Sequence, residues 1–294
     1  MSRLKKLDIF RSALYMPGSN ERALEKAKGL DCDALIFDLE DAVAPDKKDL
    51  ARQIVKEYIV SHKYDYGRKR LLVRVNSWDS PWGYKDFREV ATMMPDGILL
   101  PKINKASDFK KYFEMLDNPL DPGVKIWAMI ETASAVINMA DIASCLKNLG
   151  GFVLGTNDLA MDLNIIIDRF RYPLLASLSM ANTVAKAYKI ICLDGVYNAF
   201  KDTDGLKQEC EQGKSFGFDG KTLIHPSQIQ VTNEVFSPTD EDVRNANMQM
   251  EAYKKARSSG SGVAVLNGKI VENLHVEMAK NILEKAKIIK NTVS

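Results

Sequence analysis

The stretch Lys125–Ala133, which reads KIWAMIETA, is an apolar run that ends in a carboxylate, Glu131. A second stretch, Gly151–Asp158 (GFVLGTND), repeats this pattern and ends in Asp158. An apolar run of this length followed by a helix-like segment is typical of a strand buried in a parallel sheet. Because α/β folds usually place their active sites at the carboxyl ends of such strands, the two acidic residues are candidate functional groups.

These two carboxylates have two interpretations. On nearby strand ends they could bind one hard cation, because Mg²⁺ typically takes one or two protein carboxylates and leaves its other positions to water or substrate oxygens. Alternatively, Glu131 and Asp158 cap the helices that follow, since acidic residues favour helix N-termini. Position alone favours neither interpretation.

Strand-like runs recur along the chain, and segments of helical character separate most of them. Strands that alternate with helices predict a parallel sheet, and eight such units predict a closed (β/α)8 barrel, the TIM barrel of the α/β class. A doubly wound open sheet is the alternative, but it would be expected to carry a glycine-rich phosphate turn after its first strand, and Pro17–Asn20 (PGSN) is not one. The eight runs are Ser12–Pro17, Ala34–Leu39, Leu71–Asn76, Gly97–Ile103, Lys125–Glu131, Gly151–Asn157, Ile191–Tyr197 and Gly220–His225. The clearest helical segments are Asn20–Gly29, Lys47–Val60, Ser134–Leu149 and Pro173–Lys189.

After His225 the pattern changes, and the remaining chain is not needed to close a barrel. It predicts a polar helix over Thr239–Ser258, a flexible break at 260–262 (GSG), a strand over Val263–Leu266, a turn at Asn267-Gly268 and a helix over Asn273–Ile289. We therefore expect residues 1–235 to form the barrel. Residues 236–294 are expected to form a helical extension, and extra elements of this kind often cover a site or make subunit contacts.

The composition suits an ordinary globular protein, with 294 residues, 46% of them hydrophobic and 27% charged. A net charge of +2 provides no broad field for nucleic acid or an anionic membrane, so neither is an expected partner. No secretory signal or membrane-spanning run is apparent. None of the four cysteines forms a close sequence pair, which argues against a zinc site or a disulfide framework and favours a reduced, cytoplasmic setting.

Three further acids, Asp38, Glu40 and Asp41, follow the second strand-like run. Like charges this close repel one another unless a cation or hydrogen bonds compensate, although a solvated turn with a helix cap is the simpler interpretation. Arg74 lies within the apolar run VRVN (73–76), where an unpaired charge is costly. It could bind a substrate carboxylate through two parallel hydrogen bonds or pair with one of the acids, and both can hold at once.

Three other candidates are weaker. Lys102 in LPK (100–102) could form a Schiff base, but a metal site would make one unnecessary. His225 lies near no obvious serine or cysteine partner, and such a histidine is more often structural. The sequence Gly220-Lys221-Thr222 fails the phosphate-loop pattern, which requires a glycine where Ser215 stands.

An ordered set of motifs nevertheless resembles the citrate lyase β-subunit-like family of the HpcH/HpaI aldolase superfamily, to which malyl-CoA and citramalyl-CoA lyases belong. The resemblance runs from about Arg11 to the C-terminal helix. Its motifs are RSALYMPG (11–18), FDLEDAV (37–43), RVN (74–76), LPK (100–102), IETA (130–133), NDL (157–159) and GKTLIHP (220–226).

The resemblance implies a TIM barrel, usually trimeric, with a Mg²⁺ site whose ligands are Glu131 and Asp158. Arg74 would hold a 2-oxo acid, and Asp38, Glu40 and Asp41 would orient metal-bound waters. The CoA part of a thioester would contact Tyr15, Arg22 and Lys26, and the backbone of Thr222 and Leu223 would lie near the thioester. In the family a neighbouring subunit supplies a catalytic aspartate in a Gly-x-Met-Ile-Asp pattern. Here GKIVE (268–272) places Glu272 at that position, with a side chain one methylene longer.

The implied activity is reversible Claisen-type cleavage of a short 3-hydroxyacyl-CoA into an acyl-CoA and a 2-oxo acid. In this scheme Glu272 moves the proton at the thioester α-carbon, and Arg74 stabilises the developing alkoxide. A thioesterase on the same scaffold, a citrate lyase β chain acting on a carrier-protein thioester, and a binding module for CoA esters are the alternatives. The sequence does not separate the possible acyl groups, because one methyl group provides only about 1–3 kcal/mol of discrimination.

Overall fold

The computed structural model describes residues 8–114 and 116–293, which fall into two compact units. The larger unit spans Phe10–Asn233. The C-terminal unit begins at Glu234 and includes the described residues Asp8 and Ile9. The division falls within helix α10 (Ile229–Phe236), close to the boundary expected after residue 235.

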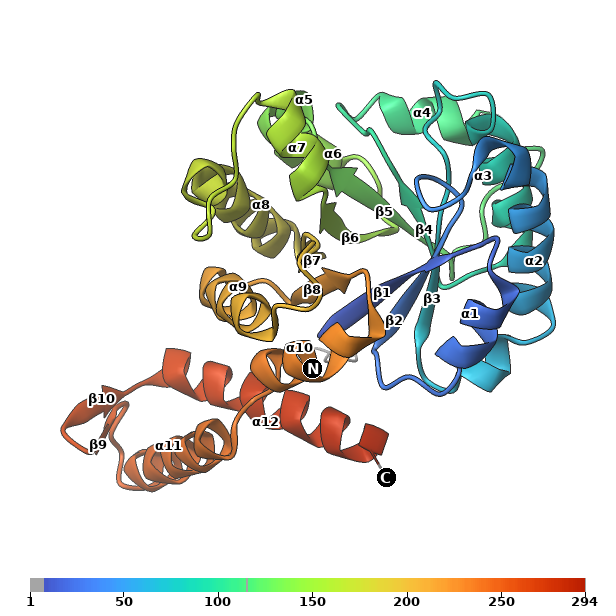
Figure 1. Ribbon diagram of the computed structural model, residues 1–294. Coiled ribbons are helices and arrows are strands. Elements are labelled where there is room, and N and C mark those ends of the chain that lie inside the picture. Colours follow the sequence, from blue (N-terminus) through green and yellow to red (C-terminus); the bar gives the residue numbers. More distant parts are fainter. Residues whose placement is uncertain (1–7, 115, 294) are drawn as a thin grey trace. The chain divides into compact units, whose positions relative to one another are not determined.

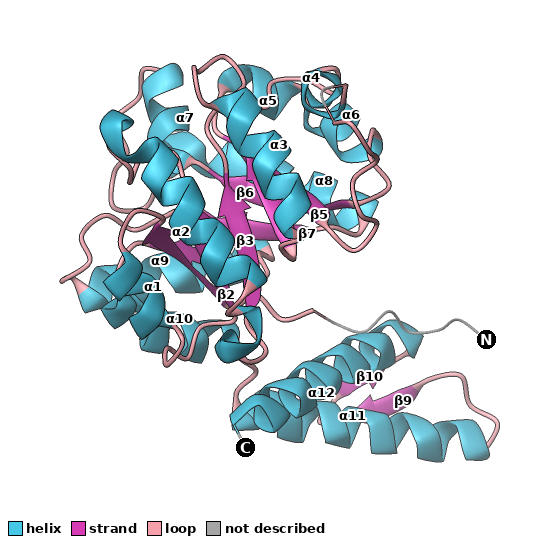
Figure 2. Ribbon diagram, turned by 90° about the vertical axis from the view of Figure 1, so that its right-hand side faces the viewer, coloured by secondary structure: helices cyan, strands magenta, loops and turns pink. Residues whose placement is uncertain are grey.

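The larger unit is a closed barrel of eight parallel strands in sequential order, in which β1 pairs with both β2 and β8. The TIM barrel predicted from the alternating pattern is therefore confirmed, and the open sheet is excluded. Figures 1 and 2 show helices surrounding the strands. The strands are β1 (Ser12–Pro17), β2 (Ala34–Asp38), β3 (Arg70–Arg74), β4 (Gly97–Leu100), β5 (Lys125–Ile130), β6 (Leu149–Leu154), β7 (Ile191–Asp194) and β8 (Gly220–Leu223).

Several strands end earlier than their apolar runs predicted. Strand β4 ends at Leu100, because Pro101 follows and Lys102 adopts a left-handed backbone conformation with φ of 53°. Strand β6 ends at Leu154, so Asp158 does not terminate a strand as expected. It is instead the third residue of helix α7. Similarly, β8 ends at Leu223, and His225 caps the short 3-10 helix η4 (Pro226–Gln228).

The helices match the expected segments only in part. The segment predicted as one helix over Ser134–Leu149 is two helices that meet at Asn138, followed by the start of β6. Other helices, such as α3 and α9, lie where no helix was predicted. The helices of the barrel unit are α1 (Glu21–Ala27), α2 (Lys48–Val60), α3 (Gly83–Met93), α4 (Asp108–Phe113), α5 (Ala133–Ile137), α6 (Met139–Ser144), α7 (Thr156–Asp162), α8 (Leu175–Tyr188), α9 (Thr203–Phe216) and the start of α10.

The barrel interior is filled by alternate residues of its strands. Its core cluster consists of Phe10, Ala13, Ala34, Ile36, Leu72, Leu99, Trp127, Met129, Val153 and Leu193. Trp127 is the largest of these side chains, and its indole occupies space that only glycine leaves free on the neighbouring strands. A Cβ atom would lie 2.8 Å from the indole at Gly97, 2.7 Å at Gly150 and 2.6 Å at Gly151. The sequence therefore accommodates one large ring by omitting three side chains.

The C-terminal unit contains two long helices and a hairpin. The helices are α11 (Asp240–Ser258) and α12 (Asn273–Val293), and they pack against each other. Antiparallel strands β9 (Ala264–Leu266) and β10 (Lys269–Val271) are joined by Asn267 and Gly268, both at positive φ, as the expected Asn-Gly turn requires. No helix in the described part of the chain combines the length and the apolarity needed to cross a bilayer.

Candidate active site at the carboxyl end of the barrel

Strand alternation brings three charged residues into one layer above the apolar core. Side chains two residues apart on a strand share a face. The core residues Ile36, Leu72 and Met129 are therefore followed, two positions later, by Asp38, Arg74 and Glu131. All three charged residues are buried. Because these positions end β2 and β3 and follow β5, the charged layer lies at the carboxyl end of the barrel, where such folds carry their active sites.

Glu131 is buried and closely packed. Its residue is 1% exposed, and its Oε1 accepts a hydrogen bond of 2.7 Å from the backbone N–H of Lys102. A Cβ atom on Gly155 would lie 2.5 Å from the Glu131 Cβ and 2.7 Å from its Oε2, so only glycine permits this close approach. Burial raises the pKa of the Glu131 carboxyl, although the charge of Lys102 and the hydrogen bond from its backbone oppose that rise.

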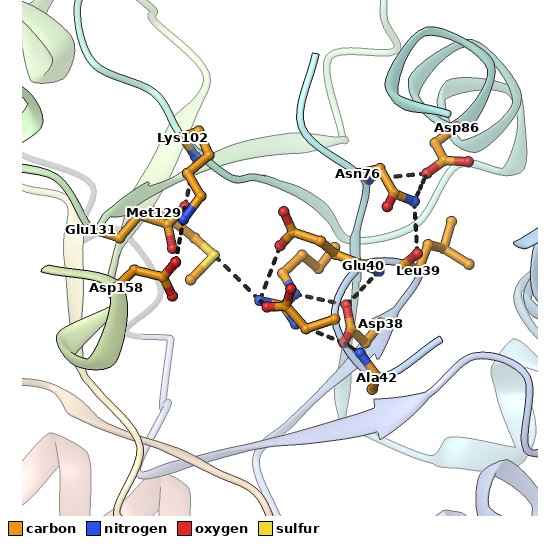
Figure 3. A network of polar contacts seen from close by, with 12 residues as sticks. Asp38, Leu39, Glu40, Ala42, Asn76, Asp86, Lys102, Met129, Glu131 and Asp158 are labelled. Atoms are coloured by element: carbon orange, nitrogen blue, oxygen red, sulfur yellow. Dashed lines mark hydrogen bonds and ion pairs between the residues drawn. The ribbon is translucent and has the colours of Figure 1, made fainter. Parts of the chain in front are cut away.

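Asp158 reaches the same place from the first turn of α7. Its carboxylate contacts the ammonium of Lys102, and that ammonium nitrogen also lies 3.7 Å from Glu131 Oε1 (Figure 3). Neither carboxylate caps a helix as the alternative interpretation expected, because Thr132 caps α5 and α7 begins after Gly155 without a side-chain cap. The two carboxylates already share one cation, and their hard oxygen atoms suit Mg²⁺.

The donor set fits an open site for this ion. Among residues 8–114 and 116–293, no three acidic, histidine or cysteine side chains gather closely enough to enclose a metal on their own. Magnesium does not require such an enclosure, because it usually retains water or substrate oxygens beside one or two carboxylates. Glu131 and Asp158 would therefore hold the ion and leave positions open for a ligand.

Lys102 is an unsuitable Schiff-base residue in this arrangement. Burial opposes the charge of its ammonium, but the hydrogen bond with Asp158 and the charge of Glu131 outweigh it and raise the pKa of Lys102. A lysine nucleophile needs the opposite change, because only the neutral amine attacks a carbonyl.

Arg74 forms two parallel hydrogen bonds with Asp38, a carboxylate of the protein itself. Its Nε and Nη2 donate to the two oxygens of Asp38 at 2.7 and 2.6 Å. Its Nη1 lies 3.1 Å from carboxylate oxygens of both Glu40 and Asp41, and its guanidinium lies 4.8 Å above the Tyr15 ring. The two parallel hydrogen bonds expected for a substrate are thus taken up by Asp38, and the Nη1 side is paired with Glu40 and Asp41.

The loop after β2 is built around Asp38. Its two oxygens accept hydrogen bonds from the backbone N–H groups of Glu40 and Ala42, at 2.9 and 3.0 Å. The loop therefore presents Glu40 beside Arg74. Burial raises the pKa of Glu40 to about 8, although the charge of Arg74 opposes the rise.

Sequence reasoning missed a buried lysine that supports this loop. The ammonium of Lys48, on α2, donates to the carbonyls of Leu39 and Glu40 and to Asn76 Oδ1, at 2.7, 2.7 and 2.8 Å. A signal was present, because helical spacing places Lys48 and Arg52 on the same face as the buried Val55. Two cations on a core-facing stripe require acidic or carbonyl partners nearby.

The residues expected to contact CoA occupy three different settings. Tyr15 is half-buried beneath Arg74. Arg22 and Lys26 are exposed on α1, four residues apart and hence on one face of the helix. Thr222 and Leu223 are fully buried in β8, where the Thr222 hydroxyl donates to the carbonyl of Asp194 at 3.0 Å.

Glu272 belongs to the C-terminal unit, and His225 follows the last barrel strand. Glu272 is exposed in the C-terminal unit between β10 and α12, and its backbone N–H donates to His275 Nδ1 at 3.2 Å. His225 stacks on Phe200 with ring centroids 4.6 Å apart and accepts a hydrogen bond from the backbone of Ser227. These contacts favour the structural interpretation of the histidine.

Comparisons with known proteins place this arrangement in context. The family model described as HpcH/HpaI aldolase/citrate lyase matches residues 11–226. A (3S)-malyl-CoA thioesterase from Cereibacter sphaeroides is 48% identical, with 95% of each chain covered. A citrate lyase subunit beta from Haemophilus influenzae is 34% identical, with 96% of this chain and 98% of that protein covered. The solved CitE of Mycobacterium tuberculosis in complex with magnesium, acetoacetate and coenzyme A has a TM-score of 0.79 at 25% identity and covers 96% of this chain and 100% of that one.

Proposed function

Because the chain belongs to the HpcH/HpaI aldolase/citrate lyase family, as its ordered motifs predicted, we propose that it is a Mg²⁺-dependent enzyme acting on a short hydroxyacyl-CoA thioester of the malyl type. The observation that carries the proposal is the pair Glu131 and Asp158, which share one cation at the mouth of the barrel beside Arg74. The first reaction that we propose is hydrolysis of the thioester, because the relatives at 48% identity are named as thioesterases.

The binding groups divide between the two ends of such a substrate. Glu131 and Asp158 would hold Mg²⁺, which supplies a Lewis acid for a carbonyl oxygen when bound. Arg74 would offer its Nη1 to the carboxylate of the acyl group in place of the exposed Asp41, while Asp38 fixes the guanidinium plane. Arg22 and Lys26, exposed on one face of α1, would contact the phosphate groups of CoA.

Hydrolysis requires a base for water, and Glu40 is the group that we assign. It lies beside Arg74 at the edge of the charged layer, and its pKa of about 8 would make it a stronger base than an ordinary carboxylate once it is ionised, at about pH 8 and above. Glu40 would take a proton from water as the water oxygen bonds to the thioester carbonyl carbon. The carbon–sulfur bond then breaks, and the leaving thiolate recovers a proton as free CoA.

Carbon–carbon cleavage is the second candidate, favoured by the relatives named citrate lyase subunit beta and by the carboxylate of Glu272. In this reaction the bond between the thioester α-carbon and the carbinol carbon breaks. The carbinol hydroxyl becomes a carbonyl, and a proton is delivered to the α-carbon. We propose that Glu272 supplies that proton across a subunit interface of a homotrimer.

The two reactions give different products from malyl-CoA. Purified protein with Mg²⁺ should release free CoA and malate if it hydrolyses, and acetyl-CoA and glyoxylate if it cleaves. A thiol reagent measures the first product, and chromatography of acyl-CoA esters measures the second. Methylmalyl-, citramalyl- and citryl-CoA, and a citryl thioester of a carrier protein, extend the assay to the alternatives. Tight CoA binding without any Mg²⁺-dependent product would contradict both enzymatic candidates.

The two candidate reactions depend on different proton-transfer groups, and variants of these groups distinguish them. Glu40→Gln should abolish hydrolysis, and Glu272→Gln should slow cleavage by about 10²–10⁴-fold, the usual range for general acid–base catalysis. If Glu272 acts in a neighbouring subunit, mixing inactive Arg74→Ala chains with inactive Glu272→Gln chains should restore part of the cleavage activity. No recovery after demonstrated subunit exchange would exclude that arrangement.

A further inference from the structure

Lys102 contacts both candidate metal ligands, and it uses a different group for each. Its backbone N–H donates to Glu131 Oε1 at 2.7 Å, and its ammonium contacts Asp158 while lying 3.7 Å from the same Glu131 oxygen (Figure 3). The ammonium is therefore the cation that the two carboxylates share. A divalent ion at this place would bind the same carboxylate oxygens that now contact Lys102.

The backbone at Lys102 is unusual for a residue with a side chain. Its φ of 53° lies in the left-handed region, which disfavours residues that carry a Cβ atom. Such a conformation persists where the surroundings determine it, and it recurs at functional sites. Here it lets the backbone amide of Lys102 contact Glu131 while the ammonium of the same residue contacts Asp158.

We propose that the Lys102 ammonium occupies the place of the divalent cation between Glu131 and Asp158 until the cation binds, and that it must withdraw for binding to occur. Lys102 thereby sets the cation affinity of the site. This inference rests on the cation site of the proposed function. Its physical basis is that two cations cannot share these oxygens without strong repulsion, whereas two neighbouring carboxylates without any cation repel each other.

The exposure of Lys102 makes this exchange feasible. Its side chain is 35% exposed, so the ammonium can move into solvent without crossing the core. Lys221, by comparison, is a fully buried lysine with 0% exposure, and its carboxylate partners enclose it. The ammonium of Lys102 can therefore move away from its carboxylates, whereas the ammonium of Lys221 stays buried beside its partners.

A metal-binding experiment tests the proposal independently of activity. Mn²⁺ is titrated calorimetrically into the metal-free full-length protein and into Lys102→Met, Lys102→Arg and Lys105→Met. Lys102→Met should bind Mn²⁺ about tenfold tighter, because the competing charge is gone. Lys102→Arg keeps the charge and should show no gain. Lys105→Met removes a charge from an exposed position on the same loop and should bind as the unaltered protein does.

The outcomes separate the role of Lys102 from the existence of the site. Binding to the unaltered protein with equal or weaker binding to Lys102→Met would overturn the role of Lys102 and leave the cation site intact. No Mn²⁺ binding to either protein would overturn both. If Lys102→Met does not fold, Lys102→Gln provides the same charge removal on a polar side chain. Mn²⁺ should also raise the Tm of the neutral variant more than that of the unaltered protein.

Discussion

Two clusters of charged side chains, one buried and one partly exposed, balance their charges differently. At the junction of β7, β8 and α9, Arg171 donates to Asp194 at 2.7 Å, and Lys221 lies 3.0 Å from Asp194 and 2.6 Å from Glu209. Two cations thus face two carboxylates. At the carboxyl end of β2, β3 and β5, three cations, Lys48, Arg74 and Lys102, face the five carboxylates Asp38, Glu40, Asp41, Glu131 and Asp158.

The pKa values follow this difference. Burial would raise the pKa of Asp194, but Lys221 and Arg171 outweigh it and lower that pKa. Burial also raises the pKa values of Glu131 and Glu40, and there the nearby cations do not compensate. A buried cluster that is neutral in itself is a structural element, whereas an excess of carboxylates creates a demand for a further cation.

The largest effect on stability is expected from breaking the neutral cluster. Lys221→Met leaves Asp194 and Glu209 without their shared cation, and removal of one partner from a buried ion pair costs about 3–5 kcal/mol of unfolding free energy. Urea unfolding measures the loss. Lys207→Met, an exposed change on α9, should leave the midpoint almost unaltered. An equally small change for Lys221→Met would show that the neutral cluster does not stabilise the fold.

A smaller loss is expected from Arg74→Lys. Lysine cannot reproduce the two parallel hydrogen bonds to Asp38, and bonds to charged groups contribute about 1.5–3 kcal/mol. Activity should fall as well, because Arg74 is the proposed substrate cation. A double-mutant cycle with Asp38→Asn tests the coupling, and additive effects on stability would argue against it. Full activity of Arg74→Lys would remove Arg74 from the substrate site.

Glu40 gives the acidic cluster a characteristic pH dependence. Its pKa rises from 4.5 to about 8 on folding, so the folded protein binds more protons than the unfolded chain between these values. Stability from this group is present in full below pH 4.5 and is lost as the pH rises through 8, by at most roughly 1.4 kcal/mol per pH unit. Chemical denaturation of the metal-free protein from pH 5 to 8 should show a decline that Glu40→Gln reduces. Glu57→Gln, on the exposed face of α2, is the matched control.

Asp158→Asn should change stability least and activity most. Removing one carboxylate from a cluster that has too many, at a side chain 34% exposed, should alter the unfolding free energy by less than about 1 kcal/mol. Activity and Mn²⁺ binding should nevertheless fall sharply, because a proposed cation ligand is lost. Normal turnover of this variant in the presence of a chelator would contradict the assigned metal site.

The sequence predicts the layer of charged residues better than it predicts their partners. The two-residue alternation of side chains along a strand is enough to place Asp38, Arg74 and Glu131 on the inner face of the barrel. The contact between Lys102 and Asp158 depends instead on a left-handed residue after Pro101 and on an early end to β6. Both are loop properties that apolar patterns do not encode. Arg74 was expected to meet a carboxylate, but only the register of β2 with β3 shows that Asp38 is the one.

The fit of Trp127 against three glycines has a consequence for how such a barrel can vary. Replacing the indole with a small side chain would open a large cavity, and adding a methyl group at Gly97, Gly150 or Gly151 would collide with it. Each single step is harmful, and only a combined change preserves the packing. These four positions, spread over three strands, should therefore be inherited and exchanged together among descendants of this sequence.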